Sequence, residues 1–334
     1  MRFQLTDDQR ALRDGVRQLL ARRFDGEALR AAVAAAGPGG AVLDRALWRE
    51  LGAAGFFALR LPEEAGGVGL GLPEAALVFE EAGRALLPGP LIATHLAAGV
   101  VPGAATGEVV VAAVDGGLVE WWAQADVVRG EPAEGGVPER GVRERGAREG
   151  GVRERGAPDG VVPERVVPVR SVDPLTPLHR VSGASGRSSG SASPGSAPNP
   201  VAVLLTAAEQ LGTAARVCEL AVQHARTREQ FGQPIGAFQA VKHLCADMLV
   251  RTEVARPALY AAAVTAGPAD IAAARLLADE AALRNTRDCL QVHGGMGFTW
   301  ESEVHLHLKR AWVRAQRGGG VTESEEALAA ELVD

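Results

Sequence analysis

The segment that follows Pro200 constrains the fold more than any other part of this sequence. Its apolar residues recur at alternating steps of four and three, the spacing that places them along one side of an α-helix. The stripe consists of Leu204, Ala208, Leu211, Ala215, Cys218, Val222 and Ala225. A stripe of about six turns is too long for a strand, so it predicts a long helix that packs against other helices.

Three more long helices are predicted after this one. They span residues 237–265, 268–292 and 302–317. Pro257 threatens a kink or break in the first of them, because proline lacks the N–H that the helix ladder needs. The glycines at 294–295 and 318–320 end the other two. Together the four helices predict an antiparallel four-helix bundle over residues 201–334.

The N-terminal third is also predicted to be helical. Thr6 and Gln9 have the spacing of a capping box, and an amphipathic pattern follows them. Two further helices are expected near residues 44–52 and 73–87, separated by a loop that Pro62 and the glycines at 66, 67, 69 and 71 require. We assign residues 1–106 to an N-terminal helical domain.

The region between these two parts predicts a reduced middle β domain, residues 107–182. Short β-branched runs on either side of Asp115-Gly116-Gly117 indicate a hairpin, and the apolar fragment 166–183 is expected to return to the sheet. Residues 129–165 contain a near-exact repeat of Arg, Glu and Gly at 141–160, which has no apolar side and predicts disorder. Residues 183–200, rich in Ser, Gly, Pro and Ala, are predicted to be a linker.

Composition narrows the class of protein. The 334 residues carry a net charge of −6, so no basic face indicates nucleic acid binding. Three separated cysteines, Cys218, Cys245 and Cys289, are expected to be buried free thiols. No stretch reaches the roughly 18 consecutive apolar residues of a membrane span, and the start has no apolar signal segment, so a cytoplasmic protein without a membrane partner is predicted.

Three sequence blocks carry a family resemblance. They read TREQFGQPIGAFQAVKH at 227–243, QVHGGMGFTWE at 291–301 and LPEEAGGVGLG at 61–71. The sequence resembles the acyl-CoA dehydrogenase family at both ends, whereas the resemblance fades between about residues 108 and 199. It implies an acyl-CoA dehydrogenase-like fold that is mainly α, an FAD cofactor, an acyl-CoA thioester as substrate and a role in lipid metabolism.

The resemblance also implies which residues contact FAD. Arg228 matches the arginine that grips the diphosphate of a neighbouring subunit's flavin, Gln239 matches the glutamine at its adenine end, and Phe231 would pack against the cofactor. A guanidinium group offers a fixed fork of donors to phosphate oxygens. The alternative is that Arg226 and Arg228 only solvate a helix end.

Gln291, Gly294 and Gly295 match the family's second flavin contact. Without side chains, two glycines let backbone donors approach a cofactor closely. The same residues are also a good helix C-terminus, and both roles are compatible.

No metal site is predicted. His305 and His307 are two positions apart on a helix and so face different directions, and His243 and His293 add no ligand spacing. Trp300 and Trp312 are expected to be core or interface aromatics, and Lys242 a solvated lysine.

The resemblance fails at the catalytic base. Dehydrogenation requires a carboxylate to remove the α proton while the flavin takes the β hydride. Alignment from Gln291 places Gly318 at the glutamate position of most members, and alignment from Arg228 places Ala202 at the position used by members resembling isovaleryl-CoA dehydrogenase. Glu209 and Glu323 are candidate substitutes, although a solvated helix residue and a tail residue are the plainer interpretations of these two.

Three hypotheses follow. The first is a subunit of a hetero-oligomeric acyl-CoA dehydrogenase that shares a flavin with a second, dehydrogenase-like subunit and passes electrons to an electron-transfer flavoprotein or similar acceptor. The second is an active homotetramer that uses Glu209 or Glu323 as base. The third is a flavin-free structural or assembly protein that kept the bundle.

Overall fold

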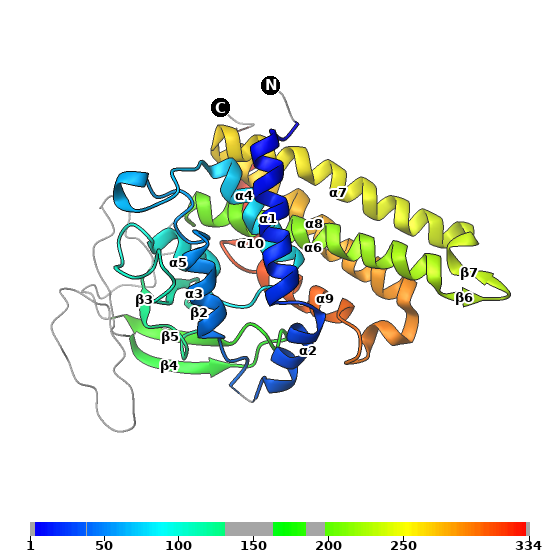
Figure 1. Ribbon diagram of the computed structural model, residues 1–334, viewed down its shortest axis with the longest axis horizontal. Coiled ribbons are helices and arrows are strands. Elements are labelled where there is room, and N and C mark those ends of the chain that lie inside the picture. The colour runs from blue at the N-terminus through cyan, green and yellow to red at the C-terminus, as the bar shows by residue number, and fades with distance from the viewer. Residues whose placement is uncertain (1–3, 38, 131–162, 185–197, 332–334) are drawn as a thin grey trace. The chain divides into compact units, whose positions relative to one another are not determined.

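The chain forms two compact units, each built from segments that lie far apart in the sequence. Figure 1 shows the computed structural model, which describes residues 4–37, 39–130, 163–184 and 198–331. Unit 1 comprises Met1–Ala34, Leu70–Leu87 and Asn199–Asp334, and unit 2 comprises Ala35–Gly69 and Pro88–Pro198. The division by chain order into 1–106, 107–182, 183–200 and 201–334 stays a prediction.

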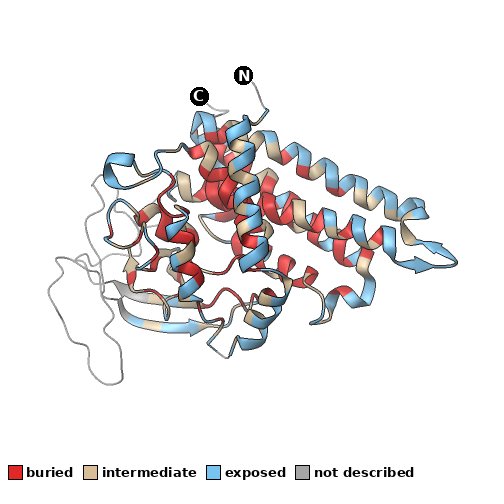
Figure 2. Cartoon of the chain, in the orientation of Figure 1, coloured by how far each residue is buried: buried red, intermediate tan, exposed pale blue. Residues whose placement is uncertain are grey.

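Helices make up most of unit 1. They are α1 (Asp7–Arg23), α2 (Gly26–Ala35), α4 (Leu72–Arg84), α6 (Pro200–Thr227), α7 (Gln239–Thr265), α8 (Pro268–His293), α9 (Val304–Ala315) and α10 (Gly320–Glu331). The predicted stripe after Pro200 becomes α6, which packs against α4, α7, α8 and α9. Buried residues therefore run along much of α6, whereas α7 is exposed over most of its length (Figure 2). The predicted mainly helical fold with a C-terminal bundle is confirmed.

Several helix ends lie where the capping signals place them. The Thr6 side chain accepts the Gln9 N–H at 3.2 Å, and the Gln9 side chain accepts the Thr6 N–H at 3.0 Å. Gly294, with a φ of 60°, ends α8. α9 ends at Ala315 with Gln316 as its C-cap, two residues before the predicted end. α10 begins at Gly320 and packs on α8, so the bundle has a helix that the sequence pattern does not predict.

Pro257 does not break α7. It lies inside the helix on an exposed face. The carbonyl of Glu253, which loses its N–H partner to the proline ring, belongs to an exposed residue and is therefore open to water. The predicted break is wrong because the missing hydrogen bond faces solvent.

A pair of glycines allows α4 and α6 to approach closely. An ideal Cβ on Gly212 would lie 1.9 Å from the backbone oxygen of Glu80, and one on Gly83 would lie 2.0 Å from the backbone oxygen of Glu209. Each helix thus presents a glycine to the backbone of the other. No side chain larger than hydrogen fits at either position without separating the helices.

Unit 2 combines short helices with one sheet. The helices are α3 (Arg45–Ala53), η1 (Glu63–Ala65) and α5 (Leu91–Ala97), and the strands are β1 (Val111–Asp115), β2 (Leu118–Glu120), β3 (Val127–Arg129), β4 (Pro163–Val169) and β5 (Leu178–Ala184). The strand order is β3-β1-β2-β5-β4, with β1 and β3 parallel and the other pairs antiparallel. Trp48 and Phe57 pack in its core, with ring centroids 4.6 Å apart.

The predicted hairpin is present in this sheet. β1 and β2 are joined by Gly116 and Gly117, whose φ angles of 56° and 73° are those a two-residue turn of this kind requires. Strands β4 and β5 cover most of the fragment 166–183, so the predicted return to the sheet is confirmed. The repeat at 141–160, and most of 129–165 and 183–200, lie outside the described residues.

One helix qualifies as a candidate membrane span by length and composition, contrary to the sequence expectation. This helix is α6, and 78% of its most apolar window is buried inside the protein. That burial is typical of the core helix of a bundle.

The cysteines of unit 1 are free thiols. Cys218 and Cys289 are buried, as predicted, and Cys245 is half-buried. Burial raises the pKa of Cys218 to about 11, so its thiol stays protonated and unreactive at neutral pH.

Candidate functional site

A short hairpin connects α6 to α7 and carries the first predicted cofactor contact. Strands β6 (Glu229–Gln230) and β7 (Gln233–Pro234) pair with each other and are joined by Phe231 and Gly232. Both of these residues have positive φ, 54° and 79°. Glycine tolerates this conformation and phenylalanine does so at a cost, which is one mark of a functional turn.

The side chains of this hairpin point to solvent. Arg228 caps α6, and its side chain makes no hydrogen bond or ion pair with any residue that the structure describes. Phe231 is 91% exposed and contacts Phe238 edge to face, with ring centroids 5.9 Å apart. The 3-10 turn η2 (Ile235–Ala237) follows, and Gln239 is the exposed first residue of α7. The hairpin therefore offers an unpaired guanidinium, an aromatic ring and an amide to a ligand.

The second predicted contact is the C-terminus of α8. Gln291, Gly294 and Gly295 are all exposed. An ideal Cβ on either glycine would meet no atom within 4 Å, so the space beside this backbone is open. The turn η3 (Gly294–Phe298) continues from here.

The fold brings these two contacts together. The rings of His224, in the last turn of α6, and His293, the last residue of α8, stack with centroids 4.1 Å apart and an angle of 20° between planes. A shared apolar cluster supports both motifs; its members include Ala225, Ile235, Leu290 and Val292. Sequence reasoning missed His224, although a histidine one turn before Arg228, next to Ala225 of the apolar stripe, was the available signal.

These residues fit the diphosphate and adenine part of a dinucleotide. Arg228 supplies a charged donor fork, and the open backbone at Gly294-Gly295 leaves room for a ligand to approach. Among the described residues, no aspartate or glutamate side chain contacts Arg228. An anionic ligand would therefore not compete with a carboxylate for this guanidinium.

The two positions of the family's catalytic base also lie together. An ideal Cβ on Gly318 would be 3.4 Å from the side chain of Val203, the residue after Ala202, and 3.9 Å from Nη1 of Arg275. Arg275 is fully buried, binds Asp279, and has no hydrogen-bond partner for Nη1 among the described residues. Glycine and alanine thus occupy the two positions, and the buried guanidinium of Arg275 lies close to Gly318.

The candidate substitute bases differ in their surroundings. Glu209 is only 6% exposed and forms an ion pair of 3.0 Å with Arg314, so its interpretation as a solvated helix residue is wrong. Its carboxylate is enclosed in the bundle and bound to a guanidinium, which leaves it poorly placed to meet a substrate. Glu323 is exposed, and its Oε2 lies 1.9 Å from the ideal Cβ position of Gly319, beside Gly318.

The base positions and the cofactor contacts occupy opposite ends of one helix. Ala202 lies in the first turn of α6, and Arg228 follows its last residue. The helix has 28 residues, so at a rise of about 1.5 Å per residue it is about 42 Å long. That length exceeds a fully stretched flavin dinucleotide.

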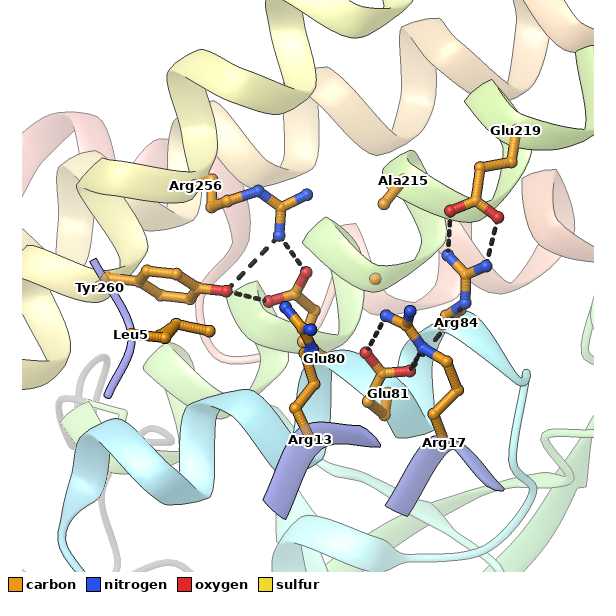
Figure 3. Close-up of a pocket in the computed structure, with 11 residues that line it drawn as sticks. Leu5, Arg13, Arg17, Glu80, Glu81, Arg84, Ala215, Glu219, Arg256 and Tyr260 are labelled. Carbon is orange, nitrogen blue, oxygen red and sulfur yellow. Dashed lines mark hydrogen bonds and ion pairs between the residues drawn. The ribbon is translucent and has the colours of Figure 1, made fainter. Parts of the chain in front are cut away.

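A separate polar pocket of about 250 Å³ lies among α1, α4, α6 and α7 (Figure 3). Its carboxylates are already paired: Arg17 binds Glu81 at 2.6 and 2.8 Å, Arg84 binds Glu219, and Tyr260 donates to Glu80 at 2.8 Å. Burial, and then the charge of Glu80, raise the pKa of Tyr260, so this phenol stays protonated. We interpret the pocket as a structural ion-pair network.

The remaining candidates carry no site. No group of three or more His, Cys, Asp or Glu that could hold a metal occurs in the part of the chain that the structure describes. His305 and His307 are both buried. Trp300 and Trp312 are 65% and 41% exposed, so neither is a core residue, and Lys309 lies over the Trp300 ring. Lys242 is exposed.

Comparison with known proteins gives matches at both ends and over the whole chain. The N-terminal domain profile of acyl-CoA dehydrogenases matches residues 6–108, and the C-terminal domain profile matches residues 202–332. Acyl-CoA dehydrogenase IpdE2 of Mycobacterium tuberculosis strain H37Rv is 36% identical over 93% of this chain and 92% of its own length.

Two further matches are a longer relative and a solved structure. Acyl-CoA dehydrogenase FadE34 of the same organism is 36% identical over 92% of this chain, but the match covers only 45% of FadE34. The crystal structure of the ChsE4-ChsE5 complex from Mycobacterium tuberculosis has the same fold, with a TM-score of 0.76, 24% identity, and 100% and 99% of the two chains covered.

Proposed function

This chain belongs to the acyl-CoA dehydrogenase family, and we propose that it is the subunit of a hetero-oligomeric enzyme that holds the adenine and diphosphate side of a shared flavin and lacks a catalytic glutamate. The family is that of oxidoreductases acting on CH–CH bonds with FAD as cofactor. When bound, FAD accepts the hydride that leaves the β carbon of the acyl-CoA.

The separation along α6 is the observation that carries this proposal. The proton and the hydride leave neighbouring carbons, so the base and the flavin ring must both contact the same substrate. A flavin whose diphosphate is bound by Arg228 cannot extend its ring to Ala202 and Gly318 at the other end of a helix about 42 Å long. In this proposal Arg228, Phe231, Gln239, Gln291, Gly294 and Gly295 therefore complete a site whose ring side belongs to another subunit.

The base positions favour an unlike partner. A homo-oligomer would place Gly318 and Ala202 of one copy beside the ring held by the next, and neither residue can accept a proton. A partner that supplies the carboxylate removes this difficulty. The family resemblance fades between about residues 108 and 199, so we assign the ring side of the flavin site to the partner as well.

Two relatives support pairing of unlike modules. FadE34 is more than twice as long as the region that matches this chain, which leaves room in it for a second module of similar length. The ChsE4-ChsE5 structure is named as a complex, and a chain in it has this fold. We extend the proposal to a cytoplasmic enzyme of lipid metabolism that takes an acyl-CoA substrate and reduces an electron-transfer flavoprotein or similar acceptor.

The absorbance spectrum of the purified protein tests the proposal. Expressed alone, the chain should carry little flavin, because it lacks the ring side of the site. Coexpressed with a second, dehydrogenase-like subunit of the same organism, it should yield a yellow complex that bleaches with an acyl-CoA. A colourless mixture in which the two chains do not associate would count against the proposal.

A second candidate function follows from the position of Glu323. Its carboxylate lies beside Gly319, next to the aligned base position, so a homo-oligomer using Glu323 as base is chemically possible. In that case the chain alone would be yellow, and Glu323→Gln would abolish bleaching by acyl-CoA. Glu326→Gln, an exposed glutamate on the same helix, is the matched control and should bleach normally.

A further inference from the structure

The stacked rings of His224 and His293 join the two cofactor contacts of unit 1. The centroid distance of 4.1 Å and the interplanar angle of 20° describe a close parallel stack between the end of α6 and the end of α8. Both rings are half-buried. One lies four residues before Arg228, and the other directly precedes Gly294.

Hydrogen bonds fix each ring or its backbone to the neighbouring motif. The carbonyl of His224 accepts the N–H of Arg228 at 2.8 Å, which sets where the arginine leaves the helix. Nδ1 of His293 lies 2.8 Å from the carbonyl oxygen of Cys289, and a carbonyl only accepts, so Nδ1 carries the proton. The His224 backbone thus holds the start of the hairpin, and the His293 ring is held in one orientation at the end of α8.

The surroundings of the stack favour a neutral His224 ring. Burial, and then the charges of His293 and Arg228, lower the pKa of His224 below its ordinary value of 6.5. The nearest titratable group on α8 is Cys289, with its sulfur 3.6 Å from Nδ1 of His293. Two charged residues act on Cys289: Arg216 on α6 and Glu303, which precedes α9. These two form an ion pair with each other at 2.7 Å. The half-buried Cys245 on α7 is a further titratable group that acts on Cys289. The turns η2 and η3 carry no titratable side chain.

We infer that His224 and His293 are positioning residues, which hold Arg228 and the Gly294-Gly295 backbone at the spacing that FAD requires and do so only while the His224 ring is uncharged. This inference rests on the proposed function, because it assumes that the two motifs share one dinucleotide. Protonation of His224 would place a second positive charge close to Arg228, within the ring stack. The stack would open and the two contacts would separate.

The test uses the complex of this chain with its partner subunit. Equilibrium dialysis measures the affinity of the complex for FAD between about pH 7.5 and about pH 5.5, the range in which histidine titrates. Wild-type affinity should fall as the pH decreases. His224→Ala should weaken FAD binding about tenfold already at the upper pH, since partners that orient a binding group commonly contribute this much. His224→Phe, which keeps a stacking ring but cannot be protonated, should bind FAD as the wild type does and lose most of the pH dependence.

Controls separate this inference from the proposed function. His243→Ala removes an exposed histidine of the same region that lies outside the stack, and its affinity and pH profile should match the wild type. Circular dichroism and copurification with the partner show that each variant is folded. Unchanged binding in His224→Ala, or affinity that rises on acidification, would overturn the inference and leave the shared site standing. A wild-type complex without FAD would instead refute the proposed function.

Discussion

Gly212→Ala should destabilise unit 1 by about 3 kcal/mol or more, at the upper end of what overpacking costs. In an exposed helix interior the same change would stabilise the protein by about 1 kcal/mol, because alanine is the better helix former. Here the new methyl group would lie 1.9 Å from the backbone oxygen of Glu80 and 2.8 Å from the backbone nitrogen of Arg84. Backbone atoms cannot rotate away as a side chain does, so α4 and α6 would have to separate.

Urea unfolding followed by circular dichroism measures this effect as a shift of the midpoint. Gly15→Ala is the matched control, since Gly15 lies inside α1, is exposed, and has no atom within 4 Å of an ideal Cβ. The control should be as stable as the wild type or slightly more stable. If Gly212→Ala unfolds at the same urea concentration as Gly15→Ala, the close approach of α4 and α6 is not present in solution.

Separated helices would also disturb charges that the contact keeps buried. Glu80 and Glu81 lie on α4 next to this crossing and are almost fully buried. Their partners come from other helices, Arg17 from α1 for Glu81, and Arg256 and Tyr260 from α7 for Glu80. A buried carboxylate that loses its partner costs about 3–5 kcal/mol, so the crossing and the ion pairs should fail together.

The sequence predicts those parts of the fold whose causes are local. The Thr6 capping box, the hairpin at Gly116-Gly117 and the end of α8 at Gly294 each depend on residues within a few positions. α10 escapes prediction because three glycines indicate an end, whereas the last of them begins a new helix. The burial of Glu209 escapes as well, because its partner Arg314 lies on α9, far along the chain.

The site divides in the same way. Sequence motifs single out Arg228 and Gly294, but only the fold brings the two motifs together, through a contact between His224 and His293. Likewise, two alignments name Gly318 and Ala202 as separate base positions, and the structure places Gly318 beside Val203, the residue after Ala202. Both positions therefore lie near the start of α6, and neither residue carries a carboxylate.

Arg228→Ala should weaken FAD binding by the complex about 10- to 100-fold. A hydrogen bond to a charged group contributes about 1.5–3 kcal/mol, and about 1.4 kcal/mol corresponds to a tenfold change in affinity. The guanidinium makes no ion pair within the described chain, so its removal should leave stability unchanged while binding falls. Arg228→Lys should recover part of the affinity, because an ammonium keeps the charge but not the planar fork.

Fluorescence of released flavin, titrated against the complex, gives the dissociation constant for each variant. Arg226→Ala is the matched control, since this arginine is also exposed at the end of α6 but lies outside the predicted contact. It should change the affinity little, apart from a small effect of net charge that high salt screens. Equal affinities for Arg228→Ala, Arg226→Ala and the wild type would mean that this end of the bundle holds no diphosphate. The third hypothesis, a flavin-free assembly protein, would then explain the results better, because the hairpin would have kept its shape without binding a ligand.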